Sequence, residues 1–245
     1  MKKIALAGLA CMAVVSPAFA ADLPVKTPVH RASPPIVANW TGCYVGGNIG
    51  YGWAPTKWSG SGVEYASHTA DGLVGGGQVG CDYQNGRWVL GIQGMFDASG
   101  MKGSSINWAL DPAGGVTDTT QISWFATLTG RVGYTLQPMT LLYVKGGVAW
   151  VRSKFNECCE PTVIIQDTSG PLEDGYANVT RTGWTVGAGV EHMFRPHWSA
   201  FLEYNFIGLG NDGITFTPIP PAPSPFIYNI HQDIHLVLVG VNYRL

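Results

Sequence analysis

Residues 121–150 alternate between apolar and polar side chains, and this alternation limits the fold of the chain more than any other feature does. After a break at Gln137 and Pro138 the alternation resumes, which is typical of two strands joined by a tight turn. A period of two residues predicts β-strands, so we expect a long antiparallel hairpin with one apolar face. That face holds Ile122, Trp124, Ala126, Leu128, Val132, Tyr134, Leu142, Val144, Val148 and Trp150, and the other holds Ser123, Thr127, Thr129, Arg131, Tyr143, Lys145 and Ala149.

The composition extends this prediction to the rest of the chain. Among 245 residues there are 33 glycines, 11% aromatic residues and only 12% charged residues, and no segment of the body shows a helical period. These proportions favour an all-β protein, and the length allows one domain.

Residues 1–20 have the features of a secretory signal peptide. Lys2 and Lys3 precede an apolar run over residues 4–15, and Ala18 and Ala20 supply an Ala-x-Ala cleavage site. A lipoprotein signal is the alternative, but Cys11 lies inside the apolar run without the surrounding lipobox residues. Without this segment, 12 basic and 16 acidic residues remain, a formal charge of −4, so the chain has no basic field for nucleic acid.

The remainder divides into a proline-rich periplasmic segment, residues 21–39, and a barrel, residues 40–245. The first contains four prolines and no sustained period, so we expect little structure there. No apolar run after the signal reaches the roughly 18 residues that a spanning helix needs. A chain of this kind can therefore cross a membrane only as a closed barrel, in which every backbone group is paired.

Eight antiparallel strands are predicted, and the connections between them alternate in length. Long loops at one end and short turns at the other are the layout of an outer-membrane barrel, in which the short turns lie in the periplasm. Aromatic residues near the loop ends of the strands fit an upper girdle: Trp53, Phe96, Trp124, Trp150, Trp184 and Phe206. The expected long connections are residues 54–71, 98–120, 152–179 and 208–231, and the short ones are residues 84–87, 135–139 and 195–197.

The strand sequences carry a resemblance to a known family. They include WTGCYVGGNIGYGW (40–53), LVGGGQVGCDYQ (73–84), WVLGIQG (88–94), GRVGY (130–134), LYVKGGVAW (142–150), GWTVGAGVEHMF (183–194) and VGVNYRL (239–245). Over essentially all eight strands, the chain resembles the RopB-type group of small porin-family outer-membrane proteins of Gram-negative bacteria, whose barrel is similar to the transmembrane domain of OmpA. The resemblance implies the fold and says little about activity.

The resemblance also implies an insertion signal at the C-terminus, which the outer-membrane assembly machinery reads. Members of the family usually end in Phe, whereas this chain ends in Leu245. Gly240, Tyr243 and the apolar terminus still fit the pattern, so we expect insertion, although less efficient insertion than with a terminal Phe.

The inward positions decide whether the barrel is a plug or a pore, because an eight-stranded barrel is just wide enough for its own side chains to fill. Gln93, Lys145 and Glu203 are each the sixth residue of an upward strand, so we expect them at similar depth. Four inward acids face four inward bases, and unpaired buried charges are costly, so we favour a charge-paired plug over an open water-filled channel. The predicted network is Asp82, Gln93, Asp97, Arg131, Lys145, Arg181, Glu191, Glu203 and Arg244.

The cysteines offer two candidate sites. If Tyr51 pairs with Leu73, the same register sets Cys43 opposite Cys81, and the periplasm is oxidising, so a cross-strand disulfide fits. The more common alternative is two small lipid-facing side chains. Cys158 and Cys159 are adjacent in a long loop, but no second Cys or His pair at ligand spacing supports a metal site.

Two groups of residues that contain histidine are candidate chemical sites. His231, Asp233 and His235 alternate on one face and could share a metal, but no third-ligand motif accompanies them, and a polar rim explains them better. His197 and Ser199 resemble the residues of lipid-modifying barrels, but no carboxylate is fixed beside them, so we do not expect an enzyme.

The predicted long loops carry an excess of acids. These acids could hold divalent cations against lipopolysaccharide phosphates, although a solvated loop surface is the simpler explanation. The acids are Glu64, Asp71, Asp111, Asp118, Glu157, Glu160, Asp167, Glu173, Asp174 and Asp212, against the bases Lys57, Lys102, Arg152 and Lys154.

The function that these features favour is a structural outer-membrane barrel that supports the envelope and displays acidic loops. A narrow porin-like channel for ions or small solutes is the alternative. The expected partners are outer-membrane lipid, lipopolysaccharide and the assembly machinery; no cofactor, metal or nucleic acid is expected, and a surface ligand is left open.

Overall fold

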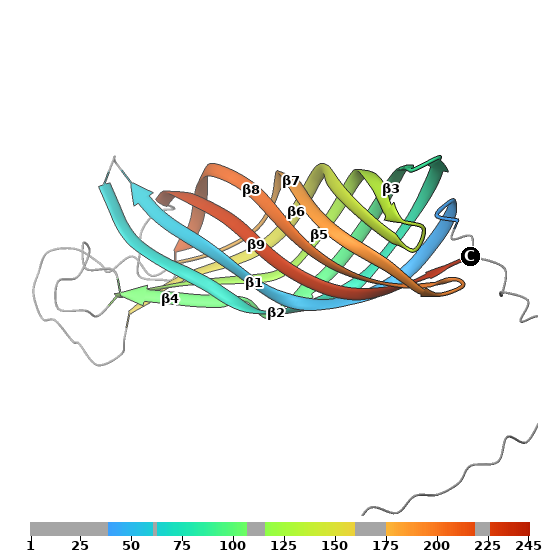
Figure 1. Ribbon diagram of the computed structural model, residues 1–245. Coiled ribbons are helices and arrows are strands. Elements are labelled where there is room, and N and C mark those ends of the chain that lie inside the picture. Colours follow the sequence, from blue (N-terminus) through green and yellow to red (C-terminus); the bar gives the residue numbers. More distant parts are fainter. Residues whose placement is uncertain (1–38, 61–62, 107–115, 160–174, 219–225) are drawn as a thin grey trace, which may run out of the picture. The chain divides into compact units, whose positions relative to one another are not determined.

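The computed structural model describes residues 39–60, 63–106, 116–159, 175–218 and 226–245. In these ranges the chain forms nine strands and no helix that is long and apolar enough to cross a membrane (Figure 1). The strands are β1 (Gly42–Gly60), β2 (Val63–Asn85), β3 (Trp88–Ser99), β4 (Lys102–Ile106), β5 (Val116–Gln137), β6 (Thr140–Cys159), β7 (Gly175–Arg195), β8 (Trp198–Pro218) and β9 (Phe226–Arg244). The expected signal peptide and nearly all of the proline-rich segment lie outside the described residues.

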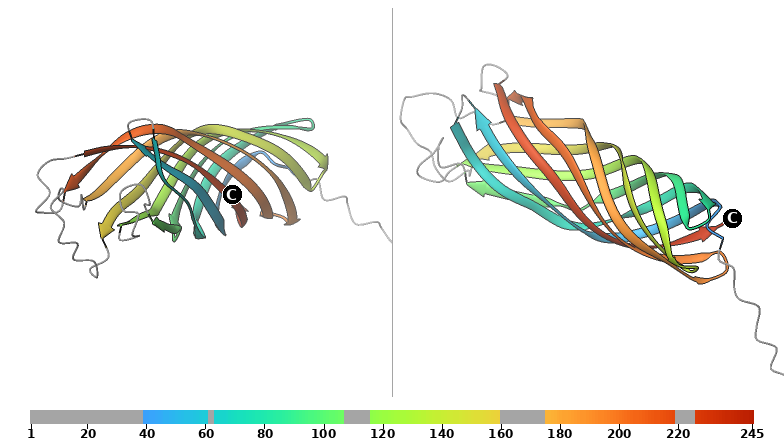
Figure 2. Two further views of the ribbon diagram at one scale, coloured as in Figure 1. Left: turned by 90° about the vertical axis from the view of Figure 1, so that its left-hand side faces the viewer. Right: turned by 45° about the horizontal axis from the view of Figure 1, so that its top comes forward.

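The strands close into an antiparallel ring. β1 pairs with β2 on one side and with β9 on the other, and every strand between them pairs with its neighbours. β3 and β4 occupy one position between β2 and β5, since both pair with both of these strands. The nine strands therefore fill eight positions around the barrel, as the sequence predicts, and Figure 2 shows them tilted and curled around its axis.

Tight turns join the strands at one end of the barrel. Gly86, in the β2–β3 turn, has a φ of 61° and His197, in the β7–β8 turn, has a φ of 71°. Glycine adopts this left-handed conformation without strain, whereas His197 is held in it. The C-terminus lies at the end where the β7–β8 turn is (Figure 1).

At the other end the strands are longer than the alternation predicts. β1 continues to Gly60 and β2 begins at Val63, so most of the predicted loop 54–71 is paired strand. Strand also covers nearly all of the described residues of the other three predicted long connections. The reason is that backbone pairing continues above the membrane, where the outer face no longer needs to be apolar and the alternation fades.

A bulge in β5 corrects the opening hairpin. Ile122 pairs with Ser153, whereas Trp124 pairs with Arg152, so the register shifts at the residue between them. A bulge of this kind changes the face on which the following side chains lie. Ile122 is therefore fully buried inside the barrel, and its prediction on the same face as Trp124 is wrong.

The outer wall is apolar, and the interior is partly so. Leu73 and Ile92 on the wall are 66% and 65% exposed, as expected of lipid-facing side chains. Inside, apolar clusters lie among the polar side chains, which the prediction of a polar inner face did not include. Their members include Trp40, Leu141 and Tyr143 in one cluster, Met101, Ile122, Phe125 and Ile207 in a second, and Trp58, Phe155, Phe216 and Ile230 in a third.

Candidate functional site

Four charged side chains form a lower network inside the barrel, near the tight turns: Asp82 (β2), Arg131 (β5), Glu191 (β7) and Arg244 (β9). Arg131 Nε donates to Asp82 Oδ1 at 2.7 Å, its Nη2 pairs with Oδ2 of the same carboxylate, and its Nη1 donates to Glu191 Oε2 at 3.0 Å. Arg244 Nη2 pairs with Asp82 Oδ2 at 2.9 Å and with Glu191 Oε1 at 3.3 Å. Each charge therefore contacts two opposite charges, which offsets the cost of burying it.

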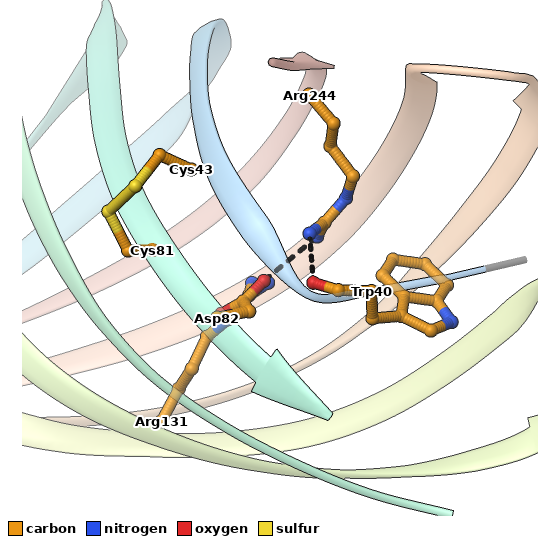
Figure 3. Close-up of a disulfide and its surroundings, with 6 residues drawn as sticks. All are labelled: Trp40, Cys43, Cys81, Asp82, Arg131 and Arg244. Carbon is orange, nitrogen blue, oxygen red and sulfur yellow. Dashed lines mark hydrogen bonds and ion pairs between the residues drawn. A yellow bond between two sulfur atoms is a disulfide. The ribbon is translucent and has the colours of Figure 1, made fainter. Parts of the chain in front are cut away.

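Trp40 closes this network toward the tight turns. The Arg244 guanidinium lies 4.6 Å from the centre of the Trp40 ring, and Arg244 Nη1 donates to the Trp40 carbonyl at 2.8 Å (Figure 3). The Trp40 indole N–H donates to the Pro138 carbonyl, in the β5–β6 turn, at 3.1 Å. Both arginines also face the Tyr44 ring, at 4.9 Å for Arg131 and 5.1 Å for Arg244. Cation–π contacts and hydrogen bonds thus hold Trp40, two residues before β1, in the lower mouth.

A middle network surrounds Glu203 on β8. Lys145 Nζ lies 2.6 Å from Glu203 Oε1 and donates to Gln93 Oε1 at 2.9 Å. The Tyr143 hydroxyl donates to Glu203 Oε2 at 2.7 Å, and Asn205 Nδ2 donates to Oε1 at 2.6 Å. The carboxylate thus has three donors, and the lysine has two acceptors, so this buried pair is well satisfied.

Glycines on the inner face make room for these long side chains. A Cβ at Gly189 would lie 2.7 Å from the Tyr143 hydroxyl oxygen, and a Cβ at Gly80 would overlap the Tyr44 hydroxyl. The two tyrosines therefore lie across glycine positions of neighbouring strands. This explains why the inner face alternates glycine with long polar residues.

Arg181 and Asp97 lie apart from the two networks. Arg181 pairs with Asp212 at 2.9 Å, and its Nη2 donates to the carbonyls of Leu209 and Ile230 at 3.2 Å. Asp212, predicted as a loop acid, thus partners an interior arginine. Asp97 is fully buried beside Gly76 but takes part in none of these ion pairs.

Cys43 and Cys81 form a disulfide between β1 and β2. They are direct register partners, and Tyr51 pairs with Leu73 as the sequence register supposes. Of the two alternatives for these cysteines, the structure therefore has the disulfide and not two separate thiols. Cys158 and Cys159 end β6, and their side chains lie outside the described residues.

The structure does not bring His197 and Ser199 together. His197 Nδ1 donates to the Arg244 carbonyl at 2.9 Å, whereas the Ser199 hydroxyl donates to buried Glu191 Oε1 at 2.6 Å. Ser199 thus belongs to the lower network.

The residues of the second histidine cluster have separate partners. His231 lies 3.4 Å from Asp233, and His235 stacks on Trp53. In the described part of the chain, no three Cys, His, Asp or Glu side chains are grouped as metal ligands.

The remaining predicted residues are distributed over strands. Tyr243 and Leu245 lie on the outer face at the tight-turn end, while Gly240 faces the Phe201 ring. Asp118, predicted as a loop acid, is fully buried inside the upper barrel, which corrects that prediction. Of the other predicted loop acids, Asp111, Glu160, Asp167, Glu173 and Asp174 lie outside the described residues.

Some residues of the two networks were not among the predicted site residues. Trp40 and Tyr44 are the clearest, together with Ser199 and Asn242, which both bind Glu191. Tyr44 could have been found, because it alternates with outward Cys43 and Val45. Trp40 precedes the strand, so no periodicity points to its position.

An antiparallel barrel of eight positions, with an apolar wall, a charge-paired interior and tight turns at one end, defines the class of bacterial outer-membrane barrels. The model of the family described as "Outer membrane protein beta-barrel domain" matches residues 6–244, so the chain belongs to that family. Its Brucella relatives are named as outer-membrane proteins, and the chain is an outer-membrane protein.

Two relatives show the extent of the similarity. The chain is 32% identical to the 31 kDa outer-membrane immunogenic protein of Brucella melitensis over 258 residues, which cover the whole of both chains. It is 29% identical over 216 residues to the 25 kDa outer-membrane immunogenic protein of Brucella abortus, covering 86% of each. Among solved structures, the outer membrane protein OprG of Pseudomonas aeruginosa aligns with a TM-score of 0.49 and 12% identity, over 86% of this chain and all of that one.

Proposed function

We propose that this protein is a non-conducting structural barrel that supports the outer membrane and displays its loop end at the cell surface. One observation carries the proposal: the inward charged side chains of the lower and middle networks are almost completely inaccessible. Lys145 is 5% exposed, Glu203 2% and Arg131 2%. An open water-filled channel would leave these side chains accessible to water.

The energetics point the same way. Opening a path along the axis would separate Arg131 from Asp82 and Glu191, or Lys145 from Glu203. Removing one partner of a buried pair costs about 3–5 kcal/mol because it leaves an uncompensated charge. A protein built in this way serves as a scaffold, and nothing in its described residues calls for catalysis.

Planar-bilayer recording tests the proposal. We expect the folded wild-type barrel, verified by heat-modifiable migration in detergent gels, to give no steady single-channel currents. Steady, large currents would instead support the alternative of a narrow channel. A strain that lacks the protein should leak periplasmic contents. When the Lys145→Met variant is expressed in that strain, it should reduce the leakage in proportion to the amount of variant that folds.

Surface display rests on the direction of the barrel and on the relatives. With the tight turns in the periplasm, the ends that lead to residues 61–62, 107–115, 160–174 and 219–225 face outward. Two relatives are named immunogenic, which supports exposure of the corresponding ends. Antibodies raised against the folded barrel should bind intact cells, and binding only after permeabilisation would contradict this orientation.

A further inference from the structure

Three cations gather on the outer face of β4 and β6, on the side of the strands that leads to the long connections. Lys102 lies across from Gln121 on β5, and Gln121 lies across from Lys154 on β6. Arg152 is two residues before Lys154 on the same face, across from Trp124 and Thr180. Lys102 and Lys154 are exposed, and Arg152 is half-buried.

These cations lie immediately above an aromatic band on the same wall. Trp150 is four residues before Lys154 on β6, and Trp124 is the register partner of Arg152. Trp124 also packs against Phe96, with ring centres 5.6 Å apart. Aromatic girdles mark the boundary between hydrocarbon and headgroups. The three cations therefore lie at the level of the lipid headgroups, on the external side.

Among the described residues, no ion pair involves Lys102, Arg152 or Lys154, and the ion pairs engage other cations. Arg152 donates to the Thr180 hydroxyl at 3.4 Å. The nearest acid on this wall, Asp71, is the register partner of Lys102 and already accepts a hydrogen bond from the Tyr51 hydroxyl. Around them lie uncharged hydrogen-bonding residues, Gln121, Asn178 and Thr180.

The wall formed by β9 and β1 differs at the corresponding level. Lys57 on β1 is four residues after the girdle residue Trp53, as Lys154 is after Trp150. Across from Lys57 lies His231, which contacts Asp233 at 3.4 Å. Among the described residues, that wall therefore has one lysine at this level, whereas the β4–β6 wall has three cations, one on β4 and two on β6.

We propose that Lys102, Arg152 and Lys154 form a binding site for the phosphorylated sugar headgroup of an outer-leaflet glycolipid. Lysine and arginine bind phosphate through charge-assisted hydrogen bonds, and arginine can do so with two donors. Adjacent strands are about 4.8 Å apart, so cations on strands separated by one can reach a single headgroup. The Trp124 and Trp150 rings would contact the first acyl carbons. This site adds a partner to the structural role and does not depend on whether the barrel conducts.

Lipid binding by the full barrel in detergent micelles tests the site. Native mass spectrometry should detect bisphosphorylated lipid A on the wild-type protein, and K102A/R152A/K154A should bind it at least about tenfold more weakly, because three charge-assisted contacts are lost. The charge-keeping variant K102R/R152K/K154R should recover most of the affinity. The matched control K57A should stay within about twofold of wild type, as expected for one exposed charge.

Two lipid arms distinguish the source of the phosphate. Dephosphorylated lipid A should bind about as weakly to the wild type as lipid A binds to the triple alanine variant. Phosphatidylglycerol, which carries one phosphate and no sugar, should lose less affinity than lipid A does when the three cations are replaced by alanine. The proposal fails if the triple alanine variant keeps wild-type affinity, if K57A weakens binding as much, or if the lipid A phosphates make no difference. None of these outcomes bears on bilayer conductance.

Discussion

At the scale of single residues, the contribution of each inward charged side chain to stability depends on its partners. Arg131 contacts two carboxylates, and Glu203 accepts from three donors. In a dry interior, removing one partner costs far more than the net gain from the pair, because the remaining charge stays buried. Point changes should therefore affect these residues in a coupled way.

The first prediction concerns Lys145 and Glu203. Lys145→Met and Glu203→Gln should each lower the free energy of unfolding by about 3–5 kcal/mol. The double change should cost less than the sum of the two, by about 0.5–3 kcal/mol, because no unpaired charge remains. Urea unfolding of the barrel in vesicles, followed by tryptophan fluorescence, measures all four corners of the cycle; plain additivity would show that the pair does not exist.

The second prediction concerns His68, inside the barrel above the aromatic girdle. Its two ring nitrogens contact the hydroxyls of Ser105 and Thr120 at 3.0 and 2.9 Å, and burial lowers the pKa of His68 below its ordinary value. The unfolded chain therefore takes up the proton first as the pH falls through about 6.5, so the folded state loses stability from there downward and keeps it above.

His68→Gln should remove this part of the pH dependence, since an amide keeps a donor and an acceptor without titrating. The measurement is the urea midpoint between pH 5 and pH 8. His192→Gln, at an exposed position on β7, is the matched histidine-to-glutamine control. A midpoint of His68→Gln that falls as steeply as that of wild type would contradict the assignment.

At the scale of elements, few side chains specify the register of the β1–β2 hairpin. Glycine occupies much of both strands between Gly46 and Gly52 and between Gly72 and Gly80. Glycine-rich strands are prone to slip, because few side chains distinguish one register from the next. The Cys43–Cys81 disulfide joins direct register partners far from the connection at residues 61–62, and so it holds this register at the opposite end.

The third prediction follows from the length of the loop that the disulfide closes. With a sequence separation of 38 residues, restriction of the unfolded chain should contribute about 4 kcal/mol. C43S/C81S should lower the free energy of unfolding by that order and give a mixture of hairpin registers on refolding, detectable by cross-linking engineered cysteines at positions 45 and 79. Dithiothreitol should destabilise wild type but not the variant; equal stability of reduced and oxidised wild type would refute the role.

At the scale of the whole molecule, closure of the sheet determines which face of each alternating strand lies inside the barrel. In an open sheet, the apolar face of residues 121–150 would be the core and Arg131 and Lys145 would be surface charges. Because β1 pairs with both β2 and β9, the apolar face lies outside and the polar face becomes the interior. The interior is then too narrow for both water and these side chains, and charge pairing with a filled lumen follows.

Features that repeat locally along the chain could be predicted from the order of its residues. Period-two alternation, tight turns and the absence of apolar helical runs predicted the strands and the barrel. Counting along strands placed Lys145 and Glu203 at one depth, where their side chains meet at 2.6 Å. Alternation alone could do this because, in a regular ladder, a residue's face and height follow from its position in the strand.

Features that depend on several strands at once could not be predicted in this way. The bulge at residue 123 buries Ile122, the pairing of β6 and β7 extends above the membrane, and Arg181 pairs with Asp212 from a segment predicted as loop. Trp40 closes the lower mouth through contacts with β9 and the β5–β6 turn. Each of these joins residues far apart in the chain, and a local period carries no information about which distant partner lies across the lumen.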